Sequence, residues 1–217
     1  MQVEVLYADA ALVVLNKPSG LLAVPGKNSD ECLSLRVQQQ FADALIVHRL
    51  DMSTSGLMVM ARGIPAQRLL NAHFAERRVH KRYRAVADGD CRSASTTADD
   101  WQTIDLPILV DWPNRPLRKI DFEAGKASST RWRCLGFDTE RNASTLELEP
   151  LTGRSHQLRV HLLAIGHPIL GDALYAPPEI AALAPRLLLH ATELGFAHPV
   201  SGEWIRFQCD CDFAPEA

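Results

Sequence analysis

The ten residues from His48 to Leu57 have the composition of a loop that presents one acidic side chain. Asp51 follows the apolar stretch 45–47, and a Ser/Thr/Gly turn then leads into a second apolar stretch, 57–60. Two strands joined by this loop would place Asp51 at a strand end, where a rigid scaffold can hold a carboxylate over a cleft. A carboxylate held there is suited to nucleophilic catalysis. The simpler interpretation is a turn residue whose side chain caps its own backbone.

Three other segments bring basic, polar and aromatic side chains together. They are 16–21 (Asn-Lys-Pro-Ser-Gly-Leu), 81–85 (Lys-Arg-Tyr-Arg-Ala) and 153–161 (Gly-Arg-Ser-His-Gln-Leu-Arg-Val-His). Together with 48–57, and in this order, they resemble the motifs of the RluA family of pseudouridine synthases. The resemblance runs through most of the chain, including 106–116 and 166–175. It is greatest to members of the family that act on both 23S ribosomal RNA and transfer RNA.

The resemblance implies one catalytic domain over residues 1–217, without the S4 RNA-binding extension of some relatives. It implies an α+β fold, in which helices flank a mixed and largely antiparallel sheet. The reaction implied is isomerisation of uridine to pseudouridine in stem-loops of 23S ribosomal RNA and transfer RNA, including the anticodon stem-loop. This reaction needs no redox change and no group donor, so no cofactor or metal is expected. No obligatory protein partner is evident.

Three residues are expected to be catalytic through this resemblance. Asp51 matches the catalytic aspartate, which either attacks C1′ of the ribose or helps to form a glycal-like intermediate; the sequence leaves both routes open. Arg159 matches the arginine that pairs with this aspartate, and its permanent charge would favour the ionised carboxylate. Tyr83 matches an active-site tyrosine whose ring could stack on the detached uracil and whose hydroxyl could relay a proton.

The target uridine must leave its stack to reach Asp51, and Arg49 is a candidate to brace the gap. His48 and His156 are expected to support the loop that presents Asp51. A metal site at the histidines is not expected, because His156 and His161 are five residues apart on a helix, not four. Lys17 is a candidate to contact phosphate, with capping of its own turn as the alternative. The remaining candidates for phosphate contact are Arg77, Arg78, Lys81, Arg82, Arg115, Arg118 and Lys119.

The charge of the chain is uneven. The formal net charge of −3 argues mildly against a nucleic-acid partner. Residues 77–84 nevertheless carry five positive side chains, whereas 88–105 is rich in aspartate. A local basic stripe can bind RNA despite a negative total, so RNA remains the expected partner.

Apolar periodicity predicts more strands than helices, without regular βαβ alternation. A hairpin is expected over 3–7 and 12–15, and helices over about 30–42, after Pro65 and from a Ser155 cap to about 165. In the second helix Leu69, Leu70 and Phe74 should form the apolar face. A strand over 81–87 should place Tyr83, Ala85 and Ala87 on one side, followed by a loop over 88–100. The other strands are expected near 102–110, 117–123, 130–137, 144–149, 187–196 and 203–209.

Composition and the N-terminus bear on location. The chain has 47% hydrophobic and 23% charged residues, with no apolar run near the roughly 18 residues that span a bilayer. The start, Met1 to Glu4, lacks the order of a secretion signal, and five scattered cysteines suit a reducing compartment. A cytoplasmic protein without a membrane partner is therefore expected. Cys209 and Cys211 are expected to share one face of a terminal strand.

Two other functions are compatible with parts of the sequence. A non-catalytic RNA-binding or assembly module would keep the fold and the basic residues without chemistry at Asp51. A hydrolase with a carboxylate nucleophile would need a second carboxylate about 5 Å away if its substrate were a glycoside. The combination of Asp51, Tyr83 and Arg159 favours the isomerase over the module, and the matched motifs contain no carboxylate to partner Asp51 as a glycoside hydrolase requires.

Overall fold

The computed structural model describes residues 3–26, 29, 31–92 and 100–213. The chain forms two compact units, each with its own hydrophobic core. The first contains the residues up to Lys81 together with His190–Cys211, and the second contains Arg82–Leu189 together with the residues from Asp212 on.

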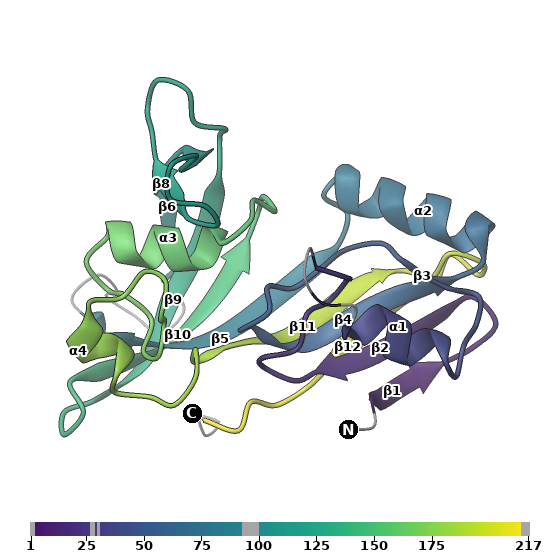
Figure 1. The fold of residues 1–217 in the computed structure, drawn as a ribbon, viewed down its shortest axis with the longest axis horizontal. Coiled ribbons are helices and arrows are strands. Elements are labelled where there is room, and N and C mark those ends of the chain that lie inside the picture. Colours follow the sequence, from purple (N-terminus) through teal and green to yellow (C-terminus); the bar gives the residue numbers. More distant parts are fainter. Residues whose placement is uncertain (1–2, 27–28, 30, 93–99, 214–217) are drawn as a thin grey trace. The chain divides into compact units, whose positions relative to one another are not determined.

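The first unit is built on a sheet with strand order β1-β2-β4-β11, on which β3 pairs with β4 and β12 pairs with β11 (Figure 1). β4 and β11 are parallel, and the other pairs are antiparallel. Its elements are β1 (Glu4–Ala8), β2 (Leu12–Lys17), α1 (Leu33–Gln38), β3 (Ala44–Ile46), β4 (Ser55–Arg62), α2 (Ile64–Ala75), β11 (Leu189–Ala197) and β12 (Trp204–Gln208). The first residue of β11, Leu189, is counted with the second unit.

The central strand β4 carries the site loop because it is buried along almost its whole length. Met58 and Met60 enter a core with Val13 and Leu15 of β2, and α1 adds Leu33 and Val37 to the same core. Helix α2 packs on β3 and β4 (Figure 1). The loop that contains Asp51 thus begins and ends on strands held by a core.

The second unit contains a sheet with strand order β5-β10-β9-β6 and a separate two-stranded hairpin, β7–β8. All of these pairs are antiparallel. Its elements are β5 (His80–Asp88), β6 (Gln102–Asp105), β7 (Ile108–Val110), β8 (Arg118–Ile120), β9 (Ser129–Asp138), β10 (Ala143–Pro150), α3 (Gln157–Ala164) and α4 (Pro178–Ala181). The first two residues of β5, His80 and Lys81, are counted with the first unit.

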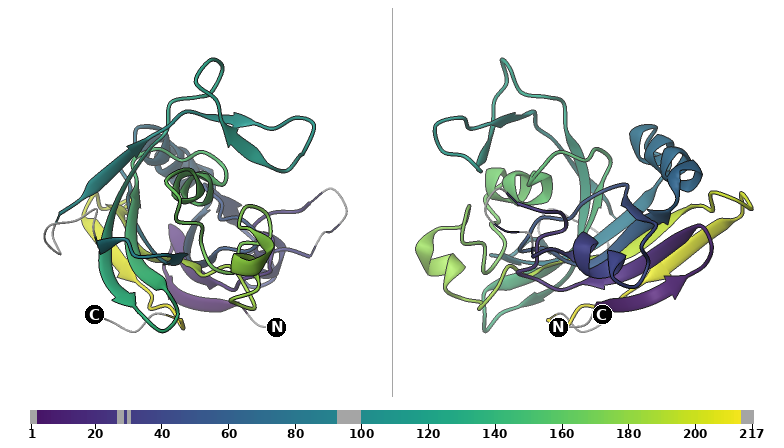
Figure 2. Two further views of the ribbon diagram at one scale, coloured as in Figure 1. Left: turned by 90° about the vertical axis from the view of Figure 1, so that its left-hand side faces the viewer. Right: turned by 45° about the vertical axis from the view of Figure 1, so that its right-hand side comes forward.

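Alternation along the strands decides which face of this sheet is covered. On β10, Leu146 and Leu148 are buried, whereas Glu147 and Glu149 point to the other face. Helix α3 lies against the apolar face, inside the curve of β9 and β10 (Figure 2), and adds Leu158 to the core. The helix that carries Arg159 is therefore anchored by its own apolar residues.

Most of the expected elements are present, and the α+β fold class is confirmed. The expected strand over 102–110 is divided into β6 and β7 by Leu106 and Pro107. The expected helix over 30–42 is limited to α1, with position 30 outside the described residues, as are 93–99 of the expected loop 88–100. Helix α4 was not expected from the sequence.

Three local predictions were wrong. Leu69 does not join the apolar face of α2 but is 47% exposed, because Ala66, Leu70 and His73 form the buried side of this helix. Helix α3 is preceded by His156 in the left-handed conformation (φ 60°), so Ser155 is not its N-cap. Cys209 and Cys211 lie beyond the end of β12 and do not share a strand face.

Gly56 is required where β4 runs beside β11. Its φ is +107°, which L side chains rarely adopt, and a Cβ there would lie 2.4 Å from the backbone oxygen of Ala191. Because that contact is with backbone of the neighbouring strand, no side-chain movement can relieve it. The glycine thus allows the strand that follows the Asp51 loop to approach β11.

We predict that Gly56→Ala lowers the free energy of unfolding by about 3 kcal/mol or more, from the unfavourable φ and the overlap with β11. Denaturant titration followed by circular dichroism would measure this loss. Gly136→Ala is the control, because a Cβ there would meet no described atom within 4 Å. Equal effects of the two substitutions would contradict the explanation.

Candidate active site

The loop between β3 and β4 holds Asp51 by hydrogen bonds to three consecutive backbone carbonyls. The Asp51 carbonyl accepts from the Thr54 amide at 3.1 Å, and that of Met52 accepts from the Gly20 amide at 2.8 Å. The carbonyl of Ser53 accepts from the Ser19 hydroxyl at 2.7 Å. Asp51 itself is half-buried. The loop is thereby joined to segment 16–21, the first of the sequence motifs.

Lys17 lies at the centre of this junction, and its side chain is fully buried. Its Nζ donates to the carbonyl oxygens of Pro18, Leu21 and Met52, at 2.8, 2.7 and 3.1 Å. Burial lowers the pKa of Lys17 to about 8, and the negative charge of Asp51 opposes this shift. All three donors of the ammonium are used within the protein. These contacts favour the turn-capping alternative for Lys17 over the phosphate contact.

His48 supports the loop from the other side. Its Nε2 accepts a hydrogen bond from the Val59 amide at 3.0 Å, and its ring stacks on Phe74 of α2, with centroids 4.5 Å apart. Burial, together with the positive charge of Lys81, lowers the pKa of His48 to about 3. The imidazole is thus neutral at physiological pH and joins the start of the loop to β4 and α2.

The other two residues expected to be catalytic lie in the second unit. Tyr83 is half-buried on β5 and packs against the core beside Ala85 and Ala87, on the predicted side of the strand. Arg159 is on α3 and is 3% exposed. Its Nε and Nη2 donate to Oδ2 and Oδ1 of Asp172, at 2.8 and 2.5 Å.

Asp172 and Tyr175 were missed as site residues by the sequence reasoning. The Tyr175 ring lies 4.9 Å from the Arg159 guanidinium, and its hydroxyl is 2.5 Å from Nδ1 of His156. The structure therefore brings the predicted residues His156 and Arg159 together around a tyrosine. Asp172 and Tyr175 could have been found from the sequence, because both belong to segment 166–175, which resembles a family motif.

The candidates for phosphate contact are divided between the two units. In the first unit, Arg49 and Arg77 are exposed, Arg78 pairs with Glu76 at 2.7 Å, and Lys81 is half-buried.

In the second unit, the basic candidates differ in how strongly they are engaged. Arg82 lies 3.5 Å from Glu149 and stacks on Trp101, so a phosphate would have to compete with these contacts. The other three belong to the β7–β8 hairpin: Arg115 is exposed above the Trp112 ring, Arg118 caps carbonyls of its own turn, and Lys119 pairs with Asp121.

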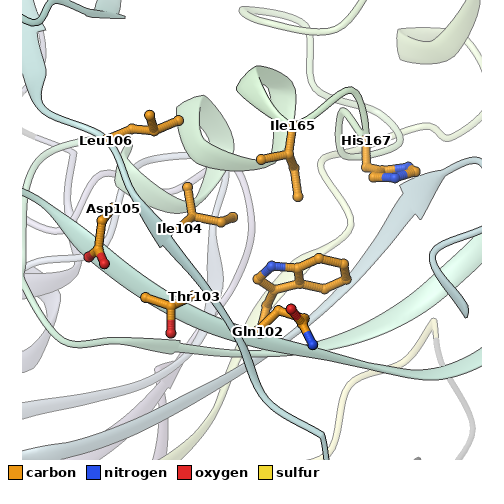
Figure 3. A pocket seen from close by; sticks show the side chains of 8 residues that line it. Gln102, Thr103, Ile104, Asp105, Leu106, Ile165 and His167 are labelled. Atoms are coloured by element: carbon orange, nitrogen blue, oxygen red, sulfur yellow. The ribbon is translucent and has the colours of Figure 1, made fainter. Parts of the chain in front are cut away.

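A cavity of about 400 Å³ lies elsewhere in the second unit, between β6 and the end of α3. Figure 3 shows Ile104 and Ile165 facing this space from the two elements. Its described lining residues are Gln102, Thr103, Ile104, Asp105, Leu106, Trp132, Ile165 and His167. This set contains none of the residues predicted from the sequence, so the cavity is separate from them.

The profile of one protein family, described as RNA pseudouridylate synthase, matches residues 11–164. The chain belongs to this family. It is accordingly an isomerase that acts on RNA, and the resemblance found in the sequence motifs is confirmed.

The chain is similar over nearly its whole length to proteins named dual-specificity RNA pseudouridine synthase RluA. It is 47% identical to that of Yersinia pestis, over 96% of this chain and 99% of the relative. It is 45% identical to that of Escherichia coli K12, over 96% and 93%. Among solved structures, human RNA pseudouridylate synthase domain containing 1 is 28% identical with a TM-score of 0.81, covering 99% of this chain and 85% of that one.

Two further observations concern the described residues alone. Within them, no group of three or more His, Cys, Asp and Glu side chains is arranged to hold a metal ion. Nor does that part of the chain contain a helix with the length and apolar character needed to cross a membrane.

We predict that Lys17→Met slows isomerisation at saturating RNA by about 100-fold, because the three carbonyls lose their donor and the Asp51 loop shifts. RNA affinity and its salt dependence should stay the same. Single-turnover kinetics and filter binding at several salt concentrations would measure both. If Lys17 instead contacted phosphate, binding would weaken and the slope of log K against log salt would fall by about one. Lys119→Met provides the comparison for that second outcome.

We predict that His48 makes the protein sensitive to acid. Its pKa is lowered on folding, so between about pH 6.5 and 3 the unfolded chain binds more protons, and stability falls as the pH falls through this range. A pKa unit corresponds to about 1.4 kcal/mol, so the stability advantage of wild type over His48→Gln should shrink by about 2–3 kcal/mol between pH 7 and 4. Urea titrations at several pH values would measure it. A pH-independent difference would contradict this role.

Proposed function

We propose that this protein converts specific uridines to pseudouridine in 23S ribosomal RNA and transfer RNA, including the anticodon stem-loop, with Asp51 as the catalytic carboxylate. Family membership supports the reaction, and the dual-specificity names of its relatives support two classes of RNA. We place this activity in the cytoplasm, where both RNAs are used.

The observation that carries the role of Asp51 is the anchoring of its loop. The backbone carbonyls of Asp51, Met52 and Ser53 each accept a hydrogen bond. The Met52 carbonyl also accepts one from the buried ammonium of Lys17. An ordinary turn aspartate needs no such support, because its side chain caps a flexible surface segment. A catalytic carboxylate does need it, since small displacements of a reacting group reduce the rate strongly.

In the proposed reaction the bond from C1′ to N1 of the uracil breaks and a bond from C1′ to C5 forms. The C5 proton is released and N1 takes up a proton, so atoms and electrons balance without a cofactor. Asp51 either forms an ester with C1′ or stabilises a glycal-like intermediate. We assign to Arg159 the charge that keeps Asp51 ionised and to Tyr83 the stacking and proton transfer on the base.

Substrate binding is proposed to rely on exposed basic and aromatic side chains. Arg49, exposed and two residues before Asp51, is suited to replace the everted uridine in the stack. The β7–β8 hairpin joins Arg115 and Lys119 with Trp112, which is 63% exposed. A basic loop that also presents an aromatic ring can contact phosphates and stack on unpaired bases.

The decisive test uses purified protein, without metal or nucleotide, and 23S ribosomal and transfer RNA transcripts tritiated at uridine C5. Wild type should release tritium at discrete sites in both RNAs, and Asp51→Ala should reduce release to background while still binding RNA. Asp43→Ala is the matched control, because this acid lies in the same unit, is exposed and pairs with Arg62. It should retain full activity.

The outcomes separate the alternatives. Tritium release from only one of the two RNAs would contradict dual specificity but would still support the isomerase reaction. RNA binding without release by wild type would favour the non-catalytic module. Full activity of Asp51→Ala would remove Asp51 as the catalytic carboxylate.

A further inference from the structure

Arg159 and Asp172 form a buried ion pair with two parallel hydrogen bonds. Their side chains are only 2% and 1% exposed. Nε donates to Oδ2 at 2.8 Å and Nη2 donates to Oδ1 at 2.5 Å, so one whole edge of the guanidinium is bound to the carboxylate. Because a guanidinium is planar and rigid, binding of one edge also determines the direction of the opposite edge.

The Asp172 carboxylate is itself held by its own turn. Oδ1 accepts from the amides of Leu174 and Tyr175, at 3.0 and 3.2 Å. The preceding residue, Gly171, has φ +75°, and a Cβ there would overlap the backbone oxygen of Arg186. Only glycine therefore allows the turn to lie against that backbone. The turn then directs the Asp172 carboxylate toward Arg159 on α3.

Tyr175 is the second residue that contacts the Arg159 guanidinium. Its ring lies 4.9 Å from Cζ of Arg159. Its hydroxyl accepts from the Arg118 amide at 2.9 Å and forms a second hydrogen bond, of 2.5 Å, with Nδ1 of His156. The ring is thus fixed between the β7–β8 hairpin and the start of α3. The carboxylate thus determines the direction of the guanidinium, and the ring supports it at cation–π distance.

We propose that Asp172 is a positioning residue of the isomerase, which orients Arg159 for its task at the catalytic carboxylate, with Tyr175 as the second support. This inference rests on the proposed function. A purely stabilising role explains the pair poorly, because apolar residues of similar volume often stabilise a protein interior equally well or better than a buried ion pair. The geometry instead matches a requirement for orientation.

Asp172→Asn is the central test, because an asparagine oxygen can still accept from the Leu174 and Tyr175 amides. The amide nitrogen, however, would face Nε of Arg159 and remove that bond. We expect kcat to fall about 100-fold on a transfer RNA stem-loop, with KM within about twofold, since Asp172 is buried away from RNA. In Arg159→Ala, adding Asp172→Asn should cause no further loss of kcat.

Thr130→Val is the matched control for lost stability. It removes buried hydrogen bonds to Gln157 and His161, on the same helix as Arg159, without touching Arg159. It should lower the melting temperature and leave kcat within about twofold of wild type. If Asp172→Asn fails to fold, Tyr175→Leu replaces it, with an expected loss of about tenfold that Arg159→Ala again abolishes.

Three results would overturn the inference: wild-type kcat in Asp172→Asn, losses that multiply in the double variant, or an equal loss in Thr130→Val. Each requires an active wild type and a silent Asp51→Ala. An inactive wild type would instead contradict the proposed function itself, so the two failures are distinguishable.

Discussion

The hydrogen bonds from the buried Lys17 ammonium organise the first half of the site. A charged group in the interior is costly unless every donor is satisfied, and here three carbonyls from two segments satisfy it. The same three bonds close the turn that follows β2 and attach it to the residue after Asp51. One cation thus stabilises the turn and the loop together, and the nearby negative charge of Asp51 favours its charged form.

The second unit solves a similar problem with a different pair of charges. Arg159 is buried on α3, and Asp172 satisfies one edge of it while Tyr175 covers a face. In both units a glycine with positive φ makes the arrangement possible, Gly56 beside β11 and Gly171 beside Arg186. Both glycines lie within segments that resemble family motifs in the sequence analysis, 48–57 and 166–175, so residues without chemistry of their own can still be needed to build the site.

Much of the secondary structure followed from the sequence because local patterns were strong. The apolar run of β4 and the alternation of leucine with glutamate on β10 each permit one arrangement of strand and core. Predictions were wrong where a neighbour decided the outcome. Leu69 has the right spacing for a buried residue, but the buried side of α2 runs through Leu70 and His73. Where the sequence left two roles open for Lys17, the three carbonyls around its ammonium favour turn capping over phosphate contact.

The sequence by itself determined the family, the class of reaction and Asp51 as the candidate carboxylate, because these depend on residue types in a fixed order. It also placed Arg159 on a helix and Tyr83 on a strand. Only the tertiary structure showed that Asp172 binds Arg159 and that Lys17 is fully enclosed. The physical reason is that hydrogen-bond partners distant in the chain, such as residues 17 and 52 or 159 and 172, leave no periodic signal. Their pairing exists only once separate cores have brought the segments together.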